Sequence, residues 1–570
     1  MLSVLQGFIS EIPADLIVFF EIGIMILIAT TIGFLMRVFK QPLIPAYIIT
    51  GILIGPLALG LIKDPNLIFS LSQIGIAFLI FTAGLEIQFK KLKEVGSVSL
   101  IAGALEVILL FLISFFIFGW FGVSGKALIY IGLIVAFSST MIIVKLLSDR
   151  DELDTLYGRI LIGILVIQDI AAIIALSILL SDLTLNSLVI ILIKALVFVV
   201  LALILSKIVN PMFRVAAKNT EFLLLVSISF LFLLTIGASV AGLSLVIGAF
   251  FAGVILANSD YKLEIEGKIG PLREFFALIF FVALGMQLEL IPKEFFSIFL
   301  ICLALILIVK PVVTMVLVRI LGYEKRTAFL TGNALAQTSE FSLIILTIGL
   351  NAKDINHGLF STLVLITVLT MYLTNYLINY GNGIFRMFGW ILNPFKSIVI
   401  KKYNSTKDYY KPKIIIFGCH RMGSLLLKEF KRENKQVLVV DYNPKIIKSL
   451  KEKKTQCVYG DFMNEEIFNR INLEETEIIV STVTDVDDNL LLLKKIKKVN
   501  PKTLVFIVAK RISEAKRLYK SGADYVILPM VIGGQKGYEL IKKISNNKSL
   551  ITDVRSEHIK YLDSIHNLLY

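Results

Sequence analysis

The chain has 570 residues, 56% of them hydrophobic, and its mean hydropathy is +0.83. This composition excludes an ordinary soluble globular protein and indicates a protein built largely within a membrane. The net charge of +14 could suit a nucleic acid or a membrane surface, so the positions of the basic residues have to decide between these partners.

Apolar segments long enough to cross the ~30 Å hydrocarbon layer of a bilayer recur from Leu16 to about Tyr380. The first segment is not expected to be a signal peptide, because no Lys or Arg precedes Arg37. The pattern predicts about thirteen spans, at residues 16–39, 43–60, 71–89, 97–120, 128–147, 158–180, 186–206, 221–240, 242–258, 274–289, 295–320, 327–350 and 358–380.

Basic residues are distributed unevenly among the loops that join these spans. If the amino terminus lies outside, the cytoplasmic loops are rich in them, for example Lys90, Lys91, Lys93, Arg150, Arg159, Lys268, Arg273, Arg319, Lys325 and Arg326. The opposite loops hold only Lys63, Lys126, Lys293 and Lys353. This asymmetry predicts an odd number of spans and a cytoplasmic carboxyl terminus. The expected location is the plasma membrane. The positive charge then needs no nucleic-acid partner.

Gln168 and Asp169 lie in the middle of the apolar segment 160–180. A carboxylate at the centre of a bilayer costs about 2.5–3.5 kcal/mol, so such a residue usually has a function. Water-poor surroundings disfavour the charged carboxylate, and a proton and a metal cation would therefore compete for Asp169. The alternative is a buried aspartate that is paired for structural reasons.

Polar residues interrupt two further spans. The interruptions are Phe137-Ser138-Ser139-Thr140 in the fifth span and Ala336-Gln337-Thr338-Ser339-Glu340-Phe341 in the twelfth. Because they fall in different halves of the membrane part, they are typical of inverted repeats whose unwound helices meet at a site near the midplane. The half-helix ends would help to hold an ion near Asp169. For the Ser/Thr cluster alone, ordinary interhelical packing is the alternative.

Lys310 precedes Pro311 in the eleventh span and is the predicted partner of Asp169. A proline there can kink the helix and expose carbonyl groups. Three roles stay open for Lys310: salt-bridge partner, displaced counter-ion and static brace. Glu106 and Glu21 are interpreted first as packing residues.

The composition changes near residue 385. The sequence predicts a membrane domain at 1–385, a linker at 386–412, a nucleotide-binding domain at 413–547 and a carboxyl-terminal tail at 548–570. Short apolar strands alternate with amphipathic helices in the third of these segments, which predicts a parallel, doubly wound, Rossmann-like sheet. The predicted strands are 414–418, 436–441, 456–460, 477–483, 503–509 and 525–528.

The first turn of this domain reads Gly418-Cys419-His420-Arg421-Met422-Gly423. It follows an apolar strand and opens a helix, and Asp441 lies about twenty residues further on. This context places a phosphate at the helix amino end and a carboxylate on a ribose. Because His420 replaces the middle glycine, a sheet of the same shape without a nucleotide is the alternative. No substrate domain or general acid for hydride transfer is evident, so no enzyme is expected.

Several motifs together resemble the monovalent cation:proton antiporter-2 family: Ser138-Ser139-Thr140, Gln168-Asp169-Ile170, Phe280-Phe281-Val282-Ala283-Leu284-Gly285-Met286, and Ala336-Gln337 with Glu340-Phe341. Within this family the chain is most similar to Kef-type potassium-efflux transporters, because of its Gln-Asp pair and its attached nucleotide domain. The carboxyl domain resembles the regulator-of-potassium-conductance domain, including Gly460-Asp461 and Gly522-Ala523-Asp524.

The resemblance implies a homodimer embedded in lipid, in which a core carrying both broken spans moves against a scaffold. Each cycle would exchange one potassium ion for one proton. Asp169 would carry either of them, and Gln168 would coordinate the cation without a second charge, which favours potassium over sodium. The implied ion- and proton-binding residues are Asp169, Gln168, Ser138, Ser139, Thr140, Gln337, Thr338, Glu340 and Lys310.

The resemblance also implies regulation by AMP or NAD(H) bound to the carboxyl domain, which requires that the nucleotide bind the transport states with different affinity. Residues 263–270 keep one acid of the Kef regulatory motif, Glu266, but lack its histidine. Glutathione control is therefore not supported. The implied nucleotide-binding residues are Gly418, His420, Arg421, Met422, Gly423, Asp441, Asp461, Phe462 and Thr482.

Three alternatives remain. A sodium/proton antiporter of the same fold would share every motif above. A nucleotide-gated potassium channel would need a glycine-rich carbonyl filter, and the sequence contains none. A redox sensor could use Cys419 and Cys457, but these cysteines, like Cys302, belong to no Cys-x-x-Cys pair and to no zinc or disulfide pattern.

Overall fold

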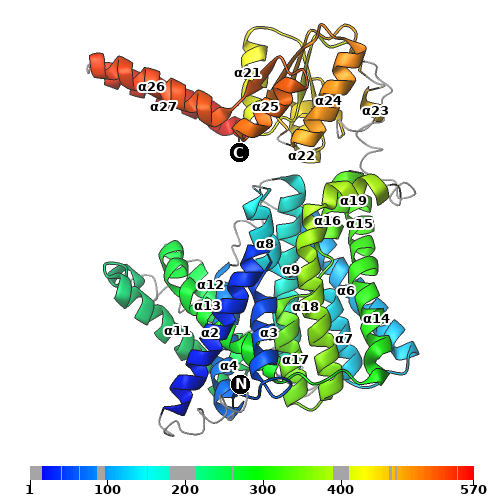
Figure 1. Ribbon diagram of the computed structural model, residues 1–570. Coiled ribbons are helices and arrows are strands. Elements are labelled where there is room, and N and C mark those ends of the chain that lie inside the picture. Colours follow the sequence, from blue (N-terminus) through cyan, green and yellow to red (C-terminus); the bar gives the residue numbers. More distant parts are fainter. Residues whose placement is uncertain are drawn as a thin grey trace. The chain divides into compact units, whose positions relative to one another are not determined.

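The computed structural model describes residues 16–39, 41–62, 65–86, 97–150, 152–153, 155–179, 212–257, 259, 261–388, 390, 410–460, 465–468, 471–483, 485–547 and 550–569. The chain divides into two compact units, one formed by Met1–Val318 and Lys325–Pro394 and the other by Arg319–Glu324 and Phe395–Tyr570. The first unit is helical, and the second contains a β-sheet (Figure 1).

The first unit is a bundle of apolar helices. A helix occurs at every predicted span except 186–206, which lies outside the described residues. Eight of the described helices are long and apolar enough to cross a membrane, and the chain is a multi-pass membrane protein. The helices are α2 (Ile17–Val38), α3 (Leu43–Ile54), α4 (Pro65–Glu86), α6 (Ser97–Trp120), α7 (Ala127–Ala136), α8 (Thr140–Asp149), α9 (Leu156–Leu179), α11 (Thr220–Val240), α12 (Leu245–Ala257), α13 (Lys262–Met286), α14 (Phe296–Ala304), α15 (Lys310–Ile320), α16 (Lys325–Ala334), α17 (Glu340–Asn351), α18 (His357–Asn379) and α19 (Gly381–Phe388).

Helix α13 begins well before residue 274, where the apolar pattern starts. Its first turns carry polar residues such as Glu264 and Lys268, which lower the hydropathy of this part. Ile265 and Ile269 of the same turns are fully buried. An amphipathic start of this kind is helical although a hydropathy average does not detect it.

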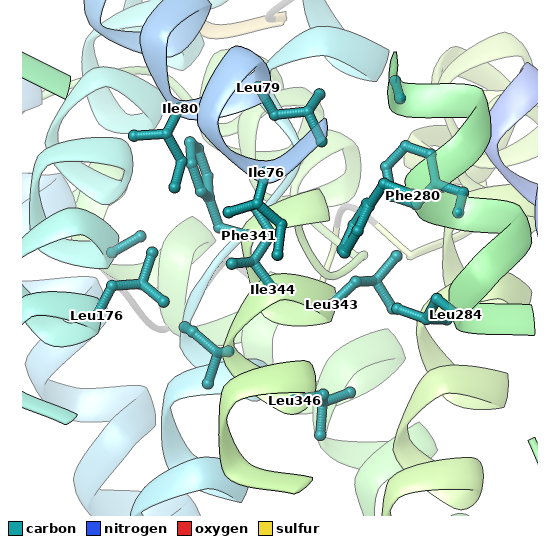
Figure 2. Close-up of a cluster of buried hydrophobic side chains, with 14 of the residues drawn as sticks. Ile76, Leu79, Ile80, Leu176, Phe280, Leu284, Phe341, Leu343, Ile344 and Leu346 are labelled. Atoms are coloured by element: carbon teal, nitrogen blue, oxygen red, sulfur yellow. The ribbon is translucent and has the colours of Figure 1, made fainter. Parts of the chain in front are cut away.

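The helices form two groups that pack against each other. In the first group α13 packs on α3 and α4, and α12 packs on α4 and α11; in the second, α6 packs on α7 and α9, and α17 packs on α18. Small residues permit close packing, since a Cβ added at Gly253 of α12 would lie 2.0 Å from Phe81 O of α4. Apolar side chains of α4, α9, α13 and α17 fill the contact between the groups (Figure 2): Ile76, Leu79, Ile80, Leu176, Phe280, Leu284, Phe341, Leu343, Ile344 and Leu346.

The fifth and twelfth spans are each broken in the middle, as predicted. Helices α7 and α8 flank residues 137–139, and helices α16 and α17 flank residues 335–339. Ser139 caps α8 and Ser339 caps α17, because each side-chain oxygen accepts a hydrogen bond from a backbone N–H of the first turn. The caps satisfy donors that the breaks would otherwise leave unpaired in the membrane.

The eleventh span is irregular immediately before Lys310. A π-helical turn, Leu305–Val309, separates α14 from α15. Such turns often mark functional sites within helices. Helix α16 approaches the start of α15 closely, because a Cβ added at Gly332 would lie 2.5 Å from Pro311 O.

The second unit contains a six-stranded parallel sheet in the order β3-β2-β1-β4-β5-β6. This is the predicted doubly wound fold, in which the strand order reverses between β1 and β4. The strands are β1 (Ile414–Phe417), β2 (Val437–Asp441), β3 (Cys457–Tyr459), β4 (Ile478–Ser481), β5 (Leu504–Val508) and β6 (Tyr525–Ile527). The helices between them are α21 (Arg421–Arg432), α22 (Pro444–Glu452), α23 (Glu465–Phe468), α24 (Val486–Val499) and α25 (Ile512–Lys520).

Two further helices follow the sheet. Helix α26 (Pro529–Asn546) ends the predicted nucleotide-binding domain, and helix α27 (Leu550–Leu569) occupies most of the predicted tail. Helix α27 packs on α21 of the same unit. The last segment therefore continues the fold of the second unit.

Candidate ion-binding site

Asp169 lies in the middle of α9 and is 9% exposed. Thr140, the first residue of α8, donates a hydrogen bond from Oγ1 to Asp169 Oδ2 at 2.8 Å. The carboxylate lines a cavity of about 20 Å³, enough for a water molecule or a small ion. The cavity is enclosed by α4, α8, α9, α13 and α17, through Leu79, Thr82, Ala83, Glu86, Thr140, Met141, Asp169, Arg273, Glu340, Phe341 and Ile344.

A second carboxylate shares this cavity. Glu340 is the first residue of α17 and is 7% exposed. Its Oε2 atom is buried and makes no hydrogen bond with any residue that the structure describes. The amino ends of α8 and α17 both begin at the cavity, and their partial positive charges favour anionic groups there. The cavity therefore combines two carboxylates, a hydroxyl and two helix amino ends.

Lys310 is fully buried and has different partners from those predicted. Its Nζ donates to Phe137 O and to Gln337 O, each at 2.7 Å. Among the described residues these carbonyls, and not the Asp169 carboxylate, are its hydrogen-bond partners. The physical reason is that the breaks expose carbonyl groups at the carboxyl ends of α7 and α16, which need a donor in the absence of water.

Gln168 connects the first break to Glu106, a buried carboxylate of α6. Its Oε1 accepts a hydrogen bond from Ser138 N at 2.9 Å, and its Nε2 donates to Glu106 Oε2 at 3.2 Å. Thr314 Oγ1 donates to Glu106 Oε1 at 2.5 Å, and the charges of Lys310 and Glu106 interact. Glu106 is therefore part of a polar network, where the sequence favoured simple packing.

The remaining predicted residues hold the two breaks to each other and to α18. The hydrogen bonds run from Ser138 Oγ to Leu335 O at 3.2 Å, from Gln337 Nε2 to Ser139 O at 3.3 Å, and from Thr338 N to Thr370 Oγ1 at 3.4 Å. Thr140 and Glu340 thus face the cavity with Asp169, whereas Ser138, Gln337 and Thr338 connect the backbone around it.

Glu86 and Arg273 also line the cavity, although the sequence identified neither as a site residue. In the sequence, Arg273 is one of many basic residues in the predicted cytoplasmic loops. Glu86 ends α4 at the edge of an apolar segment. The signal available in the sequence was a pair of opposite charges at the ends of two spans, but nothing in the sequence indicated that those ends meet.

The predicted nucleotide turn forms at the carboxyl edge of the sheet, between β1 and β4. Gly418 has a φ of +84°, which favours glycine. A Cβ added at Gly423 would lie 2.0 Å from Gly418 O, so this glycine permits close packing of α21 on the turn. Thr482 Oγ1, after β4, donates to Gly418 O at 2.9 Å. This is the position where doubly wound sheets bind their ligands.

Asp441 is buried beside this turn and accepts two backbone hydrogen bonds. Cys419 N donates to Oδ2 and Asn443 N donates to Oδ1, both at 2.7 Å. His420 is exposed and has a φ of −83°, so the backbone there does not require the missing glycine. Met422 is half-buried at the start of α21. The Arg421 side chain and the whole of Asp461 and Phe462 lie outside the described part of the chain.

The buried cysteines of the second unit are poorly suited to redox chemistry. Burial, reinforced by the Asp441 carboxylate, raises the pKa of the Cys419 thiol to about 12. Burial also raises the pKa of Cys457. The thiolate is the reactive form, so both residues are held in their unreactive state at neutral pH.

Comparisons with known proteins agree with both halves of this architecture. The family described as sodium/hydrogen exchanger, transmembrane, matches residues 24–378, and the TrkA-N domain matches residues 414–529. The solved sodium proton antiporter MjNhaP1 from Methanocaldococcus jannaschii has the same fold, with a TM-score of 0.51 and 17% identity over 64% of this chain and 95% of that one.

Two curated relatives extend the comparison. K(+) efflux antiporter 6 of Arabidopsis thaliana is 29% identical over 377 residues, which are 63% of this chain and 62% of the plant protein. The chain thus spans less than two thirds of that relative's length. The glutathione-regulated potassium-efflux system protein KefC of Escherichia coli is 25% identical over 491 residues, which are 84% of this chain and 77% of KefC. The resemblance to Kef-type transporters is confirmed.

The broken crossing spans, the buried Asp169 between them and the match over residues 24–378 agree with one another. The chain belongs to the sodium/hydrogen exchanger family and carries a carboxyl-terminal TrkA-N domain.

Proposed function

We propose that this protein exchanges potassium ions for protons across the plasma membrane, with Asp169 as the carrier. The observation that carries the proposal is the position of this carboxylate, which is buried beside the helix breaks and faces a cavity shared with Glu340. A lone charge is unstable in such a place, so the carboxylate is either protonated or paired with a cation. The proton and the cation therefore exclude each other at Asp169, and this competition is the basis of the proposed exchange.

The surroundings of Asp169 suit a cation that has lost part of its water. Thr140 offers a hydroxyl oxygen, Glu340 offers a carboxylate oxygen with no other partner among the described residues, and Asp169 contributes its own oxygens. Oxygen atoms are the ligands that alkali ions prefer. We assign Gln168 a positioning role, because both of its amide groups already have partners from other helices.

Alternating access follows from the division of the helices into two groups. The cavity is bounded by α4 and α13 from one group and by α8, α9 and α17 from the other. The apolar cluster of Figure 2 lies along the same contact, toward the ends of α9, α13 and α17 that the loop charges place outside. Glu86 and Arg273 lie toward the opposite side, so this conformation is assigned as the inward-facing one. A sliding of the second group against the first would move Asp169 toward the outside, relative to the cluster residues that α4 and α13 contribute.

We further propose that AMP or NAD(H) binds the TrkA-N domain and alters the exchange rate. Gly418, Gly423, Asp441 and Thr482 supply the turn, the close helix packing and the carboxylate that such a ligand needs. The ribose hydroxyls would replace the backbone N–H groups of Cys419 and Asn443 as donors to Asp441. The assembly is proposed to be a homodimer in lipid.

Sodium/proton exchange is the second candidate, since the family match carries that name. The chemistry of the cavity is the same for both ions. The discriminating variable is the cation concentration that half-saturates exchange, measured for potassium and for sodium with the same preparation.

The test uses the purified protein in liposomes that contain a pH-sensitive dye. Addition of potassium or sodium chloride outside the liposomes should make the lumen more alkaline, because each cation that enters is exchanged for a proton that leaves, and Asp169→Asn should abolish this shift. Thr82→Val serves as a matched control, because Thr82 lines the cavity but donates only to backbone carbonyls of its own helix, so exchange should persist. Unchanged exchange in a folded Asp169→Asn protein would eliminate Asp169 as the carrier.

A further inference from the structure

Two charged residues on the cavity wall have no part in the exchange chemistry derived above. Glu86 ends α4, and Arg273 lies within α13. Arg273 Nη1 lies 3.2 Å from Glu86 Oε1, and Arg273 Nη2 lies 3.0 Å from Glu274 Oε1. Both helices belong to the group opposite the one that carries Asp169. The permanent positive charge of Arg273 therefore faces Asp169 across the contact between the two helix groups.

Arg273 lines the cavity, and its hydrogen bonding is incomplete. Its Nε is buried and has no hydrogen-bond partner in the part of the chain that the structure describes. The same holds for Oε2 of Glu340, which lines the same cavity and feels the charge of Arg273. An unpaired buried donor and an unpaired buried acceptor in one small cavity are complementary, since each is costly alone and both are satisfied if they meet.

We propose that Arg273 is a tethered counter-ion that alternates between Glu86 and Glu340 and so competes with the transported cation. The guanidinium remains charged at every physiological pH, so it can compensate an empty carboxylate site without taking up a proton. When a cation occupies the cavity, Arg273 is held by Glu86. When the cavity is empty, Arg273 turns toward Glu340. The residue thereby sets the cation concentration at which exchange half-saturates.

This proposal rests on the proposed function and makes a prediction of opposite sign for two neighbouring charges. Arg273→Gln removes the competitor, so the half-saturating potassium concentration in the liposome assay should fall by about tenfold. Glu86→Gln frees Arg273 for Glu340, so the same concentration should rise. The maximal rate reports the amount of folded protein separately, and a merely structural defect would lower that rate without shifting the half-saturation.

Three further variants make the test specific. Arg273→Lys keeps the charge and should restore the half-saturating concentration to within about twofold of the original. Glu274→Gln is the matched control, because it removes a partner of Arg273 outside the cavity wall and should shift half-saturation much less than Glu86→Gln. In the double variant with Arg273→Gln, the effect of Glu86→Gln should disappear, since Glu86 acts through Arg273.

The outcomes separate the two proposals. If Asp169→Asn still exchanges ions, the proposed function fails. If Asp169→Asn is inactive but Arg273→Gln leaves half-saturation unchanged or raises it, only the counter-ion role is refuted. A Lys variant that behaves like the Gln variant, or a Glu86→Gln effect that persists without Arg273, would equally overturn it.

Discussion

Gln168 has both of its amide groups occupied by partners from other helices. The oxygen takes the Ser138 N–H at the first break, and the nitrogen donates to Glu106. The residue next to Asp169, the proposed carrier, therefore fixes the position of α9 against the break. Its polarity is therefore needed by its protein neighbours.

Replacing Gln168 with Met should destabilise the protein. The change keeps the size of the side chain, but it leaves the buried Ser138 N–H without its acceptor and removes one of the donors to Glu106. The unpaired N–H costs about 1–3 kcal/mol of unfolding free energy. Thermal unfolding in detergent measures this loss. Gln287→Met is the control, because Gln287 ends α13 and donates one 3.3 Å bond to Ala283 O of its own helix, so its effect should be small. Equal stability of the two variants would contradict the bridging role.

Asp169 could be found from the sequence because a carboxylate within an apolar segment is conspicuous at any position in space. The partner of Lys310 could not be found in that way. Lys310 and the carbonyl of Phe137 are 173 residues apart in the chain. The sequence predicts a direct pair between Lys310 and Asp169, because both are charged residues within apolar segments. In the structure, the carbonyl groups that the breaks expose compete for the Lys310 ammonium group.

The two broken spans behave as one structural element held by Lys310. Its ammonium group neutralises the carboxyl ends of α7 and α16, while the amino ends of α8 and α17 face Asp169 and Glu340. The positive and negative half-helix ends are thus separated onto different sides of the crossing. The element therefore holds the carboxylates of Asp169 and Glu340 near the helix amino ends and the ammonium group of Lys310 near the helix carboxyl ends.

A double-mutant cycle tests this arrangement. Lys310→Met combined with Glu106→Gln should destabilise less than the sum of the single changes, with a coupling of about 0.5–3 kcal/mol, because the two charges interact. Lys310→Met combined with Asp169→Asn should be additive in thermal unfolding. Compensation in the second pair instead of the first would restore Asp169 as the partner of Lys310.

Helices α4 and α12 depend on a glycine contact. A Cβ at Gly253 would lie 2.0 Å from Phe81 O, so Gly253→Ala should force the helices apart and cost about 1–3 kcal/mol of stability. Gly267→Ala is the matched control, since Gly267 lies within α13 and a Cβ there meets nothing within 4 Å. Alanine is the better helix former, so the control should be neutral or slightly stabilising. A neutral Gly253→Ala would disprove the close contact.

At the scale of the whole molecule, a membrane unit with a candidate ion site is joined to a TrkA-N unit that contains a doubly wound sheet. Regulation requires that a nucleotide bind the transport states with different affinity. Such a coupling is reciprocal, so the presence of potassium should also change the affinity for the nucleotide. Both directions can be measured with the full chain.

Asp441→Ala should weaken the binding of AMP or NADH by about tenfold or more and should remove the response of exchange to them, because a ribose would lose its acceptor. Calorimetry on the full chain and the liposome assay check the two effects. Asp524→Ala is a matched control, since Asp524 also accepts a backbone hydrogen bond, from Val505 N, but precedes β6 at the opposite edge of the sheet. Equal affinity in the Asp441 variant and the parent would refute the role of Asp441.

The sequence by itself determined the class of the protein, most of its spans, the two breaks, the burial of the Asp169 carboxylate and the doubly wound domain with its turn. These features are local, because hydropathy, polar interruptions and strand–helix alternation are written in consecutive residues. Only the tertiary structure decided which distant groups meet: Lys310 with the carbonyls of the breaks, Gln168 with Glu106, and Arg273 with Glu86 beside Glu340. In a medium without water every buried polar group must find a partner, and the crossing of the helices determines which partner is within reach.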